Sequence, residues 1–247
     1  MEFFEKQFND VYAYMARKKA GGTLSVCDEP PVEEWPSEKN RNIVLAGDMA
    51  VELGNPSQES AALLLWTEEP GRVHPGRISL VGPELRECEG ESRPFGKVVL
   101  AEVRGFDENN SYDRYREMEG VRYDLDLKGY MLRAASQYQR EWSRVSREAL
   151  RDGFSLRFLG ASLISRLTAL DYVDAAEILF VTSGREDVLE LKKIAAESAL
   201  VINAMNKIVE EFSHDCATCD YASVCSDVEA LRRLRKVHTG SSSSETE

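Results

Sequence analysis

A turn signal leads into an apolar run in Pro94-Phe95-Gly96-Lys97-Val98-Val99-Leu100-Ala101-Glu102-Val103. Proline and glycine interrupt regular structure, and the run behind them is short, apolar and rich in valine, which indicates a buried strand over residues 98–103. Similar runs cover residues 43–46, 61–67, 78–81 and 178–181. Together these runs predict a sheet.

Helical spacing of apolar residues marks the other parts of the chain. Residues 3–19 have one apolar side and end at a glycine pair, and the pattern turns helical again from about residue 111 as far as residue 170. A long helix is expected after residues 178–181, with a capping-box pattern of Ser183 and Glu186 at its start and helical spacing as far as Phe212. We therefore predict an α+β fold, a mixed or antiparallel sheet followed by helices, rather than a regularly alternating α/β fold.

Four segments are expected along the chain. An N-terminal helix and linker span residues 1–40, and an α+β domain spans residues 41–213. A cysteine-containing segment follows over residues 214–239, and the serine-rich residues 240–247 are expected to be a disordered tail. The linker contains two Pro-rich stretches and has no predicted regular structure.

The charge balance limits the kinds of partner. The net charge is −12 at pH 7, which argues against nucleic acid and anionic membrane surfaces as partners. No apolar run reaches the roughly 18 residues that a membrane span needs, and residues 1–5 show no secretory signal pattern. The chain has 5 cysteines, an odd count that favours a reducing compartment over a disulfide framework, so we expect a cytoplasmic protein.

Cys216, Cys219 and Cys225 form the clearest candidate for a cofactor site. Their C-x2-C-x5-C spacing puts two thiolates on one tight turn with a third close behind, and thiolates bind iron–sulfur clusters and soft metals. Ser226 and Glu229 form a second capping-box pattern, so Cys225 is expected at a helix N-terminus, where the helix dipole stabilises a thiolate. The pattern predicts a [4Fe-4S] cluster in a small C-terminal segment.

Two alternatives to the cluster stay open. A structural zinc ion would need a fourth ligand, such as His214, Asp215 or His238. The three cysteines could also be buried without any ligand. The fourth ligand of a cluster is undetermined, with Cys27 and Cys88 as candidates.

Arginine dominates the basic residues between positions 72 and 166, where 15 arginines stand beside two lysines. If residues 127–150 are helical, one face carries arginine and Trp142 lies on the opposite, core-facing side. Arginine forks suit phosphates, so this face predicts a site for CoA or another nucleotide-like polyanion. The alternative is a solvated face of ion pairs, which the charge pattern alone favours. The arginines of the face are Arg133, Arg140, Arg144, Arg147 and Arg151.

Several collinear motifs resemble one known family. They are Val51-Glu52-Leu53-Gly54-Asn55-Pro56, Leu65-Trp66-Thr67, residues 76–83, Pro94-Phe95-Gly96, Met118-Glu119-Gly120, Gln137, residues 142–149, Asp152-Gly153-Phe154 and residues 178–182. Residues 43–213 thereby resemble the middle domain of CO-methylating acetyl-CoA synthase, the beta subunit of the CO dehydrogenase/acetyl-CoA synthase complex. The resemblance implies an α+β domain with an arginine-rich cavity for CoA, in the region of Gln137, Trp142 and Arg144.

The resemblance also bears on cofactors and partners. The next domain of the family carries a [4Fe-4S] cubane bridged to a dinickel site, where a methyl group from a corrinoid protein, CO and CoA form acetyl-CoA. Here Cys216 and Cys219 match the opening pair of cluster cysteines, Cys225 comes earlier than its counterpart, and the late Cys-Gly-Cys that holds nickel has no match. The resemblance implies an iron–sulfur protein that binds CoA or acyl-CoA and acts with a CO dehydrogenase subunit or a corrinoid protein in anaerobic one-carbon metabolism.

The sequence leaves open whether the chain is itself an enzyme. It contains no Walker A loop, no G-x-S-x-G motif and no H-E-x-x-H motif, and no residue is predicted to be catalytic. The other function class is a non-catalytic iron–sulfur protein for electron transfer or assembly, in which the arginine face would dock a partner.

Overall fold

A computed structural model describes residues 2–28, 34–38, 49–87, 92–136, 139–210 and 218–240. Its longer strands form two sheets, a five-stranded sheet of order β1-β4-β9-β6-β3 and a four-stranded sheet of order β5-β2-β8-β7. The strands are β1 (Leu24–Cys27), β2 (Ala50–Leu53), β3 (Ser60–Thr67), β4 (Ile78–Val81), β5 (Ser92–Arg93), β6 (Phe95–Val103), β7 (Tyr130–Ser136), β8 (Arg140–Ser146) and β9 (Val173–Val181). The helices are α1 (Glu5–Ala20), η3 (Leu85–Glu87), α2 (Ser111–Gly120), η4 (Val121–Tyr123), α3 (Arg147–Asp152), α4 (Leu156–Thr168), α5 (Arg185–Glu210), α6 (Ala222–Asp227) and α7 (Glu229–Gly240).

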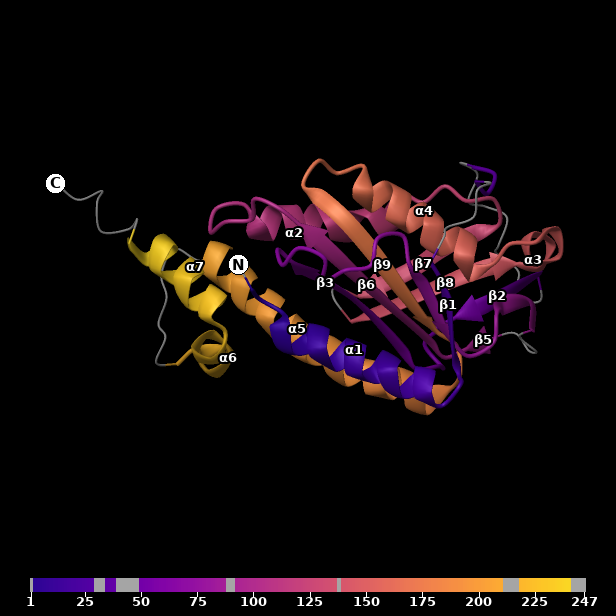
Figure 1. The fold of residues 1–247 in the computed structure, drawn as a ribbon, viewed down its shortest axis with the longest axis horizontal. Coiled ribbons are helices and arrows are strands. Elements are labelled where there is room, and N and C mark those ends of the chain that lie inside the picture. The colour runs from indigo at the N-terminus through magenta and orange to yellow at the C-terminus, as the bar shows by residue number, and fades with distance from the viewer. Residues whose placement is uncertain are drawn as a thin grey trace.

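The five-stranded sheet is mixed and covered on both faces. β3 runs parallel to β6 and β4 runs parallel to β9, while the central pair β6 and β9 is antiparallel. Helices α2 and α4 lie on one side of this sheet, and α1 and α5 lie on the other (Figure 1). Every residue of β3 is buried, as expected for a strand with helices on both faces. The predicted α+β fold with a mixed sheet is confirmed.

An aromatic cluster around Trp66 fastens α1 to the sheet. Trp66 lies on β3 and is fully buried. The Phe4 ring meets it edge-on with ring centroids 4.5 Å apart, and Tyr115 from α2 lies 5.0 Å away. Large buried rings contribute much of a core's apolar area. This cluster therefore holds the first helix and α2 against the same strand.

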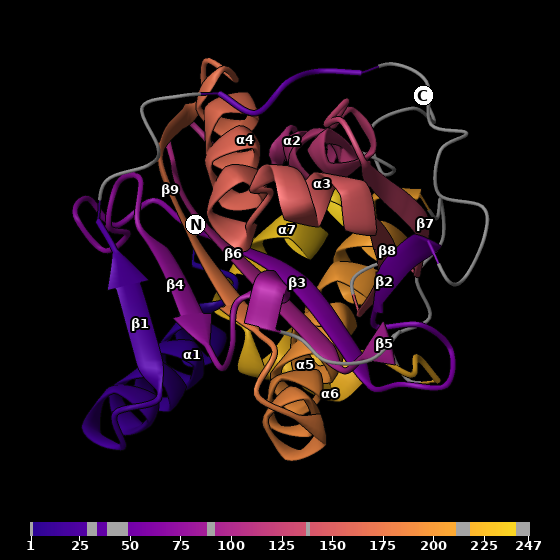
Figure 2. The ribbon, with the colours of Figure 1, turned by 90° about the vertical axis from the view of Figure 1, so that its right-hand side faces the viewer.

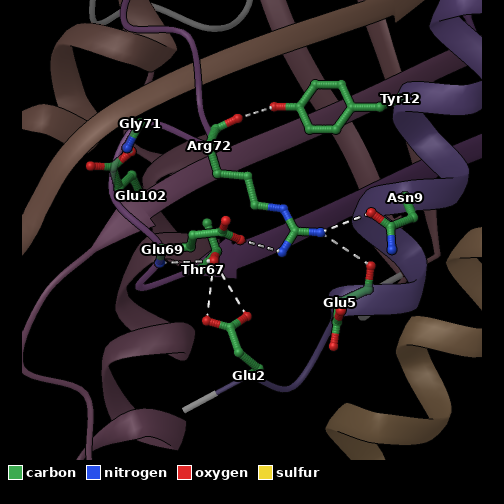
Figure 3. A network of polar contacts seen from close by, with 9 residues as sticks. All are labelled: Glu2, Glu5, Asn9, Tyr12, Thr67, Glu69, Gly71, Arg72 and Glu102. Atoms are coloured by element: carbon green, nitrogen blue, oxygen red, sulfur yellow. Dashed lines mark hydrogen bonds and ion pairs between the residues drawn. The ribbon is translucent and has the colours of Figure 1, made fainter.

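Arg72 links α1 to the loop after β3 (Figure 3). Its Nη1 donates to Glu69 at 2.8 Å, and its Nη2 donates to Asn9 Oδ1 at 3.0 Å and to the Glu5 carbonyl at 3.4 Å. In return, the Tyr12 hydroxyl donates to the Arg72 carbonyl at 2.7 Å. Arg72 thus donates hydrogen bonds to two successive turns of α1. These bonds hold the helix in place together with its apolar contacts.

The elements with strong local signals were predicted correctly. The N-terminal helix ends at Gly21 as expected, and the strands predicted at residues 61–67, 78–81, 98–103 and 178–181 are all present. The long helix α5 is confirmed, but it begins at Arg185 and the Ser183 hydroxyl donates to Asp187, so the predicted capping box with Glu186 is wrong. The strand expected at residues 43–46 and residues 241–247 of the expected tail lie outside the described residues.

The helical prediction for residues 111–170 is confirmed at α2, α3 and α4 and is wrong for residues 130–136 and 140–146. Between α2 and α3 the chain forms a hairpin of β7 and β8, whose register pairs Tyr130 with Val145 and Ala135 with Glu141. The helical prediction rested on the spacing of apolar residues, and the arginine face followed from it. Burial instead alternates along β8 with a period of two, and its edge is paired with β2, so the tertiary context determines the strand.

The C-terminal helices extend the molecule along α5. Helix α5 has 26 residues and is therefore roughly 39 Å long, and α6 and α7 lie beside its C-terminal half, away from the hairpin (Figure 1). Ala230, Leu231 and Leu234 on α7 are buried. The C-terminal segment is thus packed onto the rest of the structure through an apolar helix face.

Candidate functional site

The hairpin places three of the predicted site residues on one face of the four-stranded sheet. Figure 2 shows β8 between β2 and β7, with α3 close by. Along β8, the half-buried Arg140, Trp142 and Arg144 alternate with the buried Glu141 and Ser143. Successive side chains of a strand point to opposite faces. The two arginines and the tryptophan therefore share one side of the strand.

Two guanidinium groups lie close to the Trp142 ring. The Arg133 guanidinium carbon is 5.5 Å from the Trp142 ring centroid, and the Arg144 guanidinium carbon is 5.7 Å from it. Both distances fall within the range of cation–π attraction. A depression of about 190 Å³ adjoins the ring, and its lining residues are Gly54, Pro56, Ala134, Arg140, Glu141 and Trp142. We call Arg133, Arg140, Trp142 and Arg144 the Trp142 platform.

An acidic side chain from β2 forms an ion pair with an arginine of the platform. Glu52 lies directly opposite Arg144 in the β2–β8 ladder, and its Oε1 accepts a hydrogen bond from Arg144 Nε at 2.6 Å. Arg140 Nη2 reaches the Gln58 carbonyl at 3.4 Å, which is a long contact. The two arginines of β8 thus differ, because Arg144 has a charged partner and Arg140 contacts a neutral one.

The predicted face of five arginines is corrected by the hairpin. Arg140 and Arg144 share a strand face, and Arg133 comes from the neighbouring strand β7. Arg147 is instead the first residue of α3, and Arg151 lies in the last turn of that helix. The Ser146 hydroxyl caps the helix by accepting a hydrogen bond from Ala149 N at 3.1 Å. Trp142, predicted on the core-facing side, lies with the arginines. Gln137, which the resemblance placed nearby, lies outside the described residues.

Buried charges lie behind the platform. Lys97 on β6 forms an ion pair with Glu141 on β8, and their side chains are 5% and 0% exposed. Arg122 lies 2.8 Å from Glu119 Oε2 in a second ion pair. Burial raises the pKa of Glu119 above its usual value, although the charges of Arg122 and Lys97 oppose this shift. The first pair joins the two sheets at the strand position between Arg140 and Trp142.

Three residues of this region were not predicted. Lys97 interrupts an apolar strand, and a lone lysine in such a run is a signal for a buried partner. Glu141 could have been found from the period-two burial of β8, once that segment is assigned as a strand. Glu52 carries no local signal, since its partner Arg144 is 92 positions away.

The described cysteines of the predicted cluster lie at the start of the C-terminal helices. Ala222 N donates to the Cys219 carbonyl at 3.1 Å, and Cys225 is 6% exposed within α6. The Ser226 hydroxyl donates to the Ala222 carbonyl at 2.8 Å, so it caps no following helix. The prediction of Cys225 at a helix N-terminus is therefore wrong, because α6 begins three residues earlier.

The cluster itself remains a prediction. Cys216, His214, Asp215 and Cys88 lie outside the described residues, and within the described ranges no group of three His, Cys, Asp or Glu side chains is arranged to hold a metal ion. Two thiols of one short segment nevertheless fit the donor chemistry of an iron–sulfur cluster or of zinc.

Comparison with known proteins assigns the chain to a family. The sequence model of the CO dehydrogenase/acetyl-CoA synthase complex beta subunit matches residues 38–188. The acetyl-CoA decarbonylase/synthase complex subunit beta of Methanopyrus kandleri is 27% identical over 161 residues, which cover 62% of this chain and 32% of that protein. Its counterpart in Methanothermobacter thermautotrophicus is 31% identical over 137 residues, covering 55% and 28%. The carbon monoxide dehydrogenase/acetyl-CoA synthase subunit alpha of Moorella thermoacetica is 25% identical over 167 residues, covering 67% and 22%.

The fold and the platform thus belong to an α+β protein. The chain is a member of the CO dehydrogenase/acetyl-CoA synthase complex beta subunit family. It spans about a third or less of the length of the curated relatives that it matches. Among the residues that the structure describes, no helix combines the length and the apolar character needed to cross a membrane.

Proposed function

We propose that the chain binds CoA or an acyl-CoA at the Trp142 platform and contributes this site to a CO dehydrogenase/acetyl-CoA synthase complex. The observation that carries the proposal is the Trp142 ring with the Arg133 and Arg144 guanidinium groups close to it, beside a depression of about 190 Å³. CoA has an adenine ring that can stack on an aromatic side chain and phosphates that suit arginine forks. Membership of the beta subunit family supports a role in such a complex.

The proposed partners are a CO dehydrogenase subunit or a corrinoid iron–sulfur protein. The relatives are named as subunits of such a complex, and the chain spans about a third or less of their length. Both facts support a role in which a partner subunit completes the site.

Removal of the stacking ring is expected to weaken CoA binding. Stacking of a base on an aromatic ring contributes about 1–3 kcal/mol, so Trp142→Ala should raise the Kd for CoA about tenfold or more in isothermal titration calorimetry. Arg140→Ala is expected to weaken binding as well, because it removes a cation at the depression.

The control for this experiment is Arg157→Ala. Arg157 is exposed on α4 and outside the platform, so its loss changes the net charge without touching the proposed site. No binding of CoA by the wild type at millimolar concentration would show the proposed function to be wrong. Equal affinities of the Trp142→Ala and Arg157→Ala variants would show that CoA binds elsewhere.

The cluster is expected to appear in the metal content of protein purified without oxygen. A [4Fe-4S] cluster predicts about four irons and four acid-labile sulfides per chain, both lost in Cys216→Ala. Cys27→Ala is the matched control, because Cys27, one of the two candidate fourth ligands, lies on β1, far from α6 (Figure 1), and is therefore not expected to hold the cluster. One zinc per chain without sulfide would replace the cluster by a structural metal site and would exclude the alternative of an iron–sulfur electron-transfer protein.

A further inference from the structure

Glu52 is an acidic side chain built into the platform. Its Oε1 accepts from Arg144 Nε at 2.6 Å and also forms an ion pair with Arg144 Nη2, and its Oε2 accepts from Asn55 Nδ2 at 2.7 Å. The side chains of Arg144 and Glu52 are only 12% and 13% exposed. Both carboxylate oxygens thus have donors, which separates this pair from loose surface ion pairs.

The turn after β2 holds Glu52 in this position. Asn55 Oδ1 accepts from Ser57 N at 3.1 Å and from Ser57 Oγ at 2.8 Å, an arrangement in which an asparagine stabilises a turn. The Asn55 amide group is therefore directed at Glu52 by the turn itself. On the other side, the ladder between β2 and β8 places Glu52 opposite Arg144. Backbone and side chains together determine where the Arg144 guanidinium lies.

A carboxylate beside a proposed polyanion site has two opposite physical effects. Its charge repels phosphates, and this effect alone would weaken ligand binding. Its hydrogen bonds also hold Arg144 beside Trp142 before any ligand arrives, so the long side chain loses little freedom on binding. Both oxygens of the Glu52 carboxylate are hydrogen-bonded and the side chain has low exposure, which favours the second effect here. An arginine side chain that is already ordered binds a phosphate without losing further conformational entropy.

We propose that Glu52 is a positioning residue that holds Arg144 for the phosphates of an adenosine-containing ligand. This inference rests on the proposed CoA site and adds a residue that contacts no ligand. Two residues of the motif Val51-Glu52-Leu53-Gly54-Asn55-Pro56 have a role in this arrangement. Glu52 supplies the carboxylate, and Asn55 supplies the amide that orients it. Pro56 lines the depression from the same turn.

The test compares Glu52→Gln with the wild type, using adenosine 3′,5′-bisphosphate and adenosine as probes. Glutamine keeps a hydrogen-bond acceptor but loses the charge that holds the guanidinium. The Kd for the bisphosphate is expected to rise roughly three- to tenfold, from the loss of one ordered long side chain, while the Kd for adenosine stays unchanged. Asn55→Ala should shift the bisphosphate affinity in the same direction by a smaller factor.

Matched controls separate the outcomes. Glu186→Gln removes the same charge from an exposed position on α5 and is expected to leave both affinities unchanged. Tighter binding of the bisphosphate by Glu52→Gln would mean that Glu52 only repels phosphate, and equal losses for both probes would mean a general distortion; either result overturns the inference while the CoA site stands. If the wild type binds neither probe nor CoA, the proposed site itself is wrong.

Discussion

Replacement of Lys97 by methionine is expected to lower the free energy of unfolding by about 3–5 kcal/mol. Removal of one member of a buried ion pair leaves the other charge without compensation, and this is the typical cost. Glu141 is 1% exposed and lies on the strand that carries the platform. Methionine keeps most of the length of the lysine, so little of the loss would come from a cavity. Denaturant unfolding followed by circular dichroism at pH 7 measures the effect.

A matched control and a double variant complete this experiment. Lys128→Met removes a lysine whose side chain is 41% exposed, and its expected cost is below about 0.5 kcal/mol. Combination of Lys97→Met with Glu141→Met should recover much of the lost stability, because no buried charge then remains. A decrease of less than about 1 kcal/mol in the unfolding free energy of Lys97→Met would show that the ion pair between Lys97 and Glu141 does not stabilise the contact between the two sheets.

The parts of the fold that could be predicted are those with strong local signals. The strand β3 and the helix α5 carry long apolar patterns whose period is unambiguous, and turn residues bound them. The hairpin could not be predicted in this way. Its arginines have helical spacing in the sequence, whereas its strand character depends on pairing with β2, which comes from about 90 residues earlier. Long-range pairing leaves little trace in a local pattern.

The same distinction applies to the candidate site. Residue type pointed to Arg140 and Arg144, because guanidinium groups suit phosphates whatever the backbone does, and the family resemblance added Trp142. Their geometry was wrong, since a helix would have separated Trp142 from the arginines. Glu52 was missed entirely, because its contact with Arg144 exists only once two distant strands pair. The residue types of a candidate site can be proposed from composition here, while their arrangement requires the fold.

Substitution of Gly54 by alanine is expected to destabilise the protein by about 3 kcal/mol and to abolish binding at the platform. Gly54 has a φ of 65°, a left-handed conformation that costs a non-glycine residue about 1–3 kcal/mol. A Cβ at this position would also lie 2.5 Å from the Glu141 carbonyl oxygen and 2.7 Å from Ser60 Oγ. Overpacking of this kind adds about 1–3 kcal/mol.

The contacts at Gly54 explain why binding should be lost along with stability. The Ser60 hydroxyl donates to the Glu141 carbonyl at 2.6 Å and accepts from Glu141 N at 3.0 Å, which fastens β8 to β3. A side chain that pushes this carbonyl away moves the backbone between Arg140 and Trp142. Gly22→Ala is the control, because Gly22 has a φ of 68° with nothing within 4 Å of its Cβ position. Equal unfolding free energies for the two variants would show that backbone conformation accounts for the whole effect and that the close approach to β8 has no part in it.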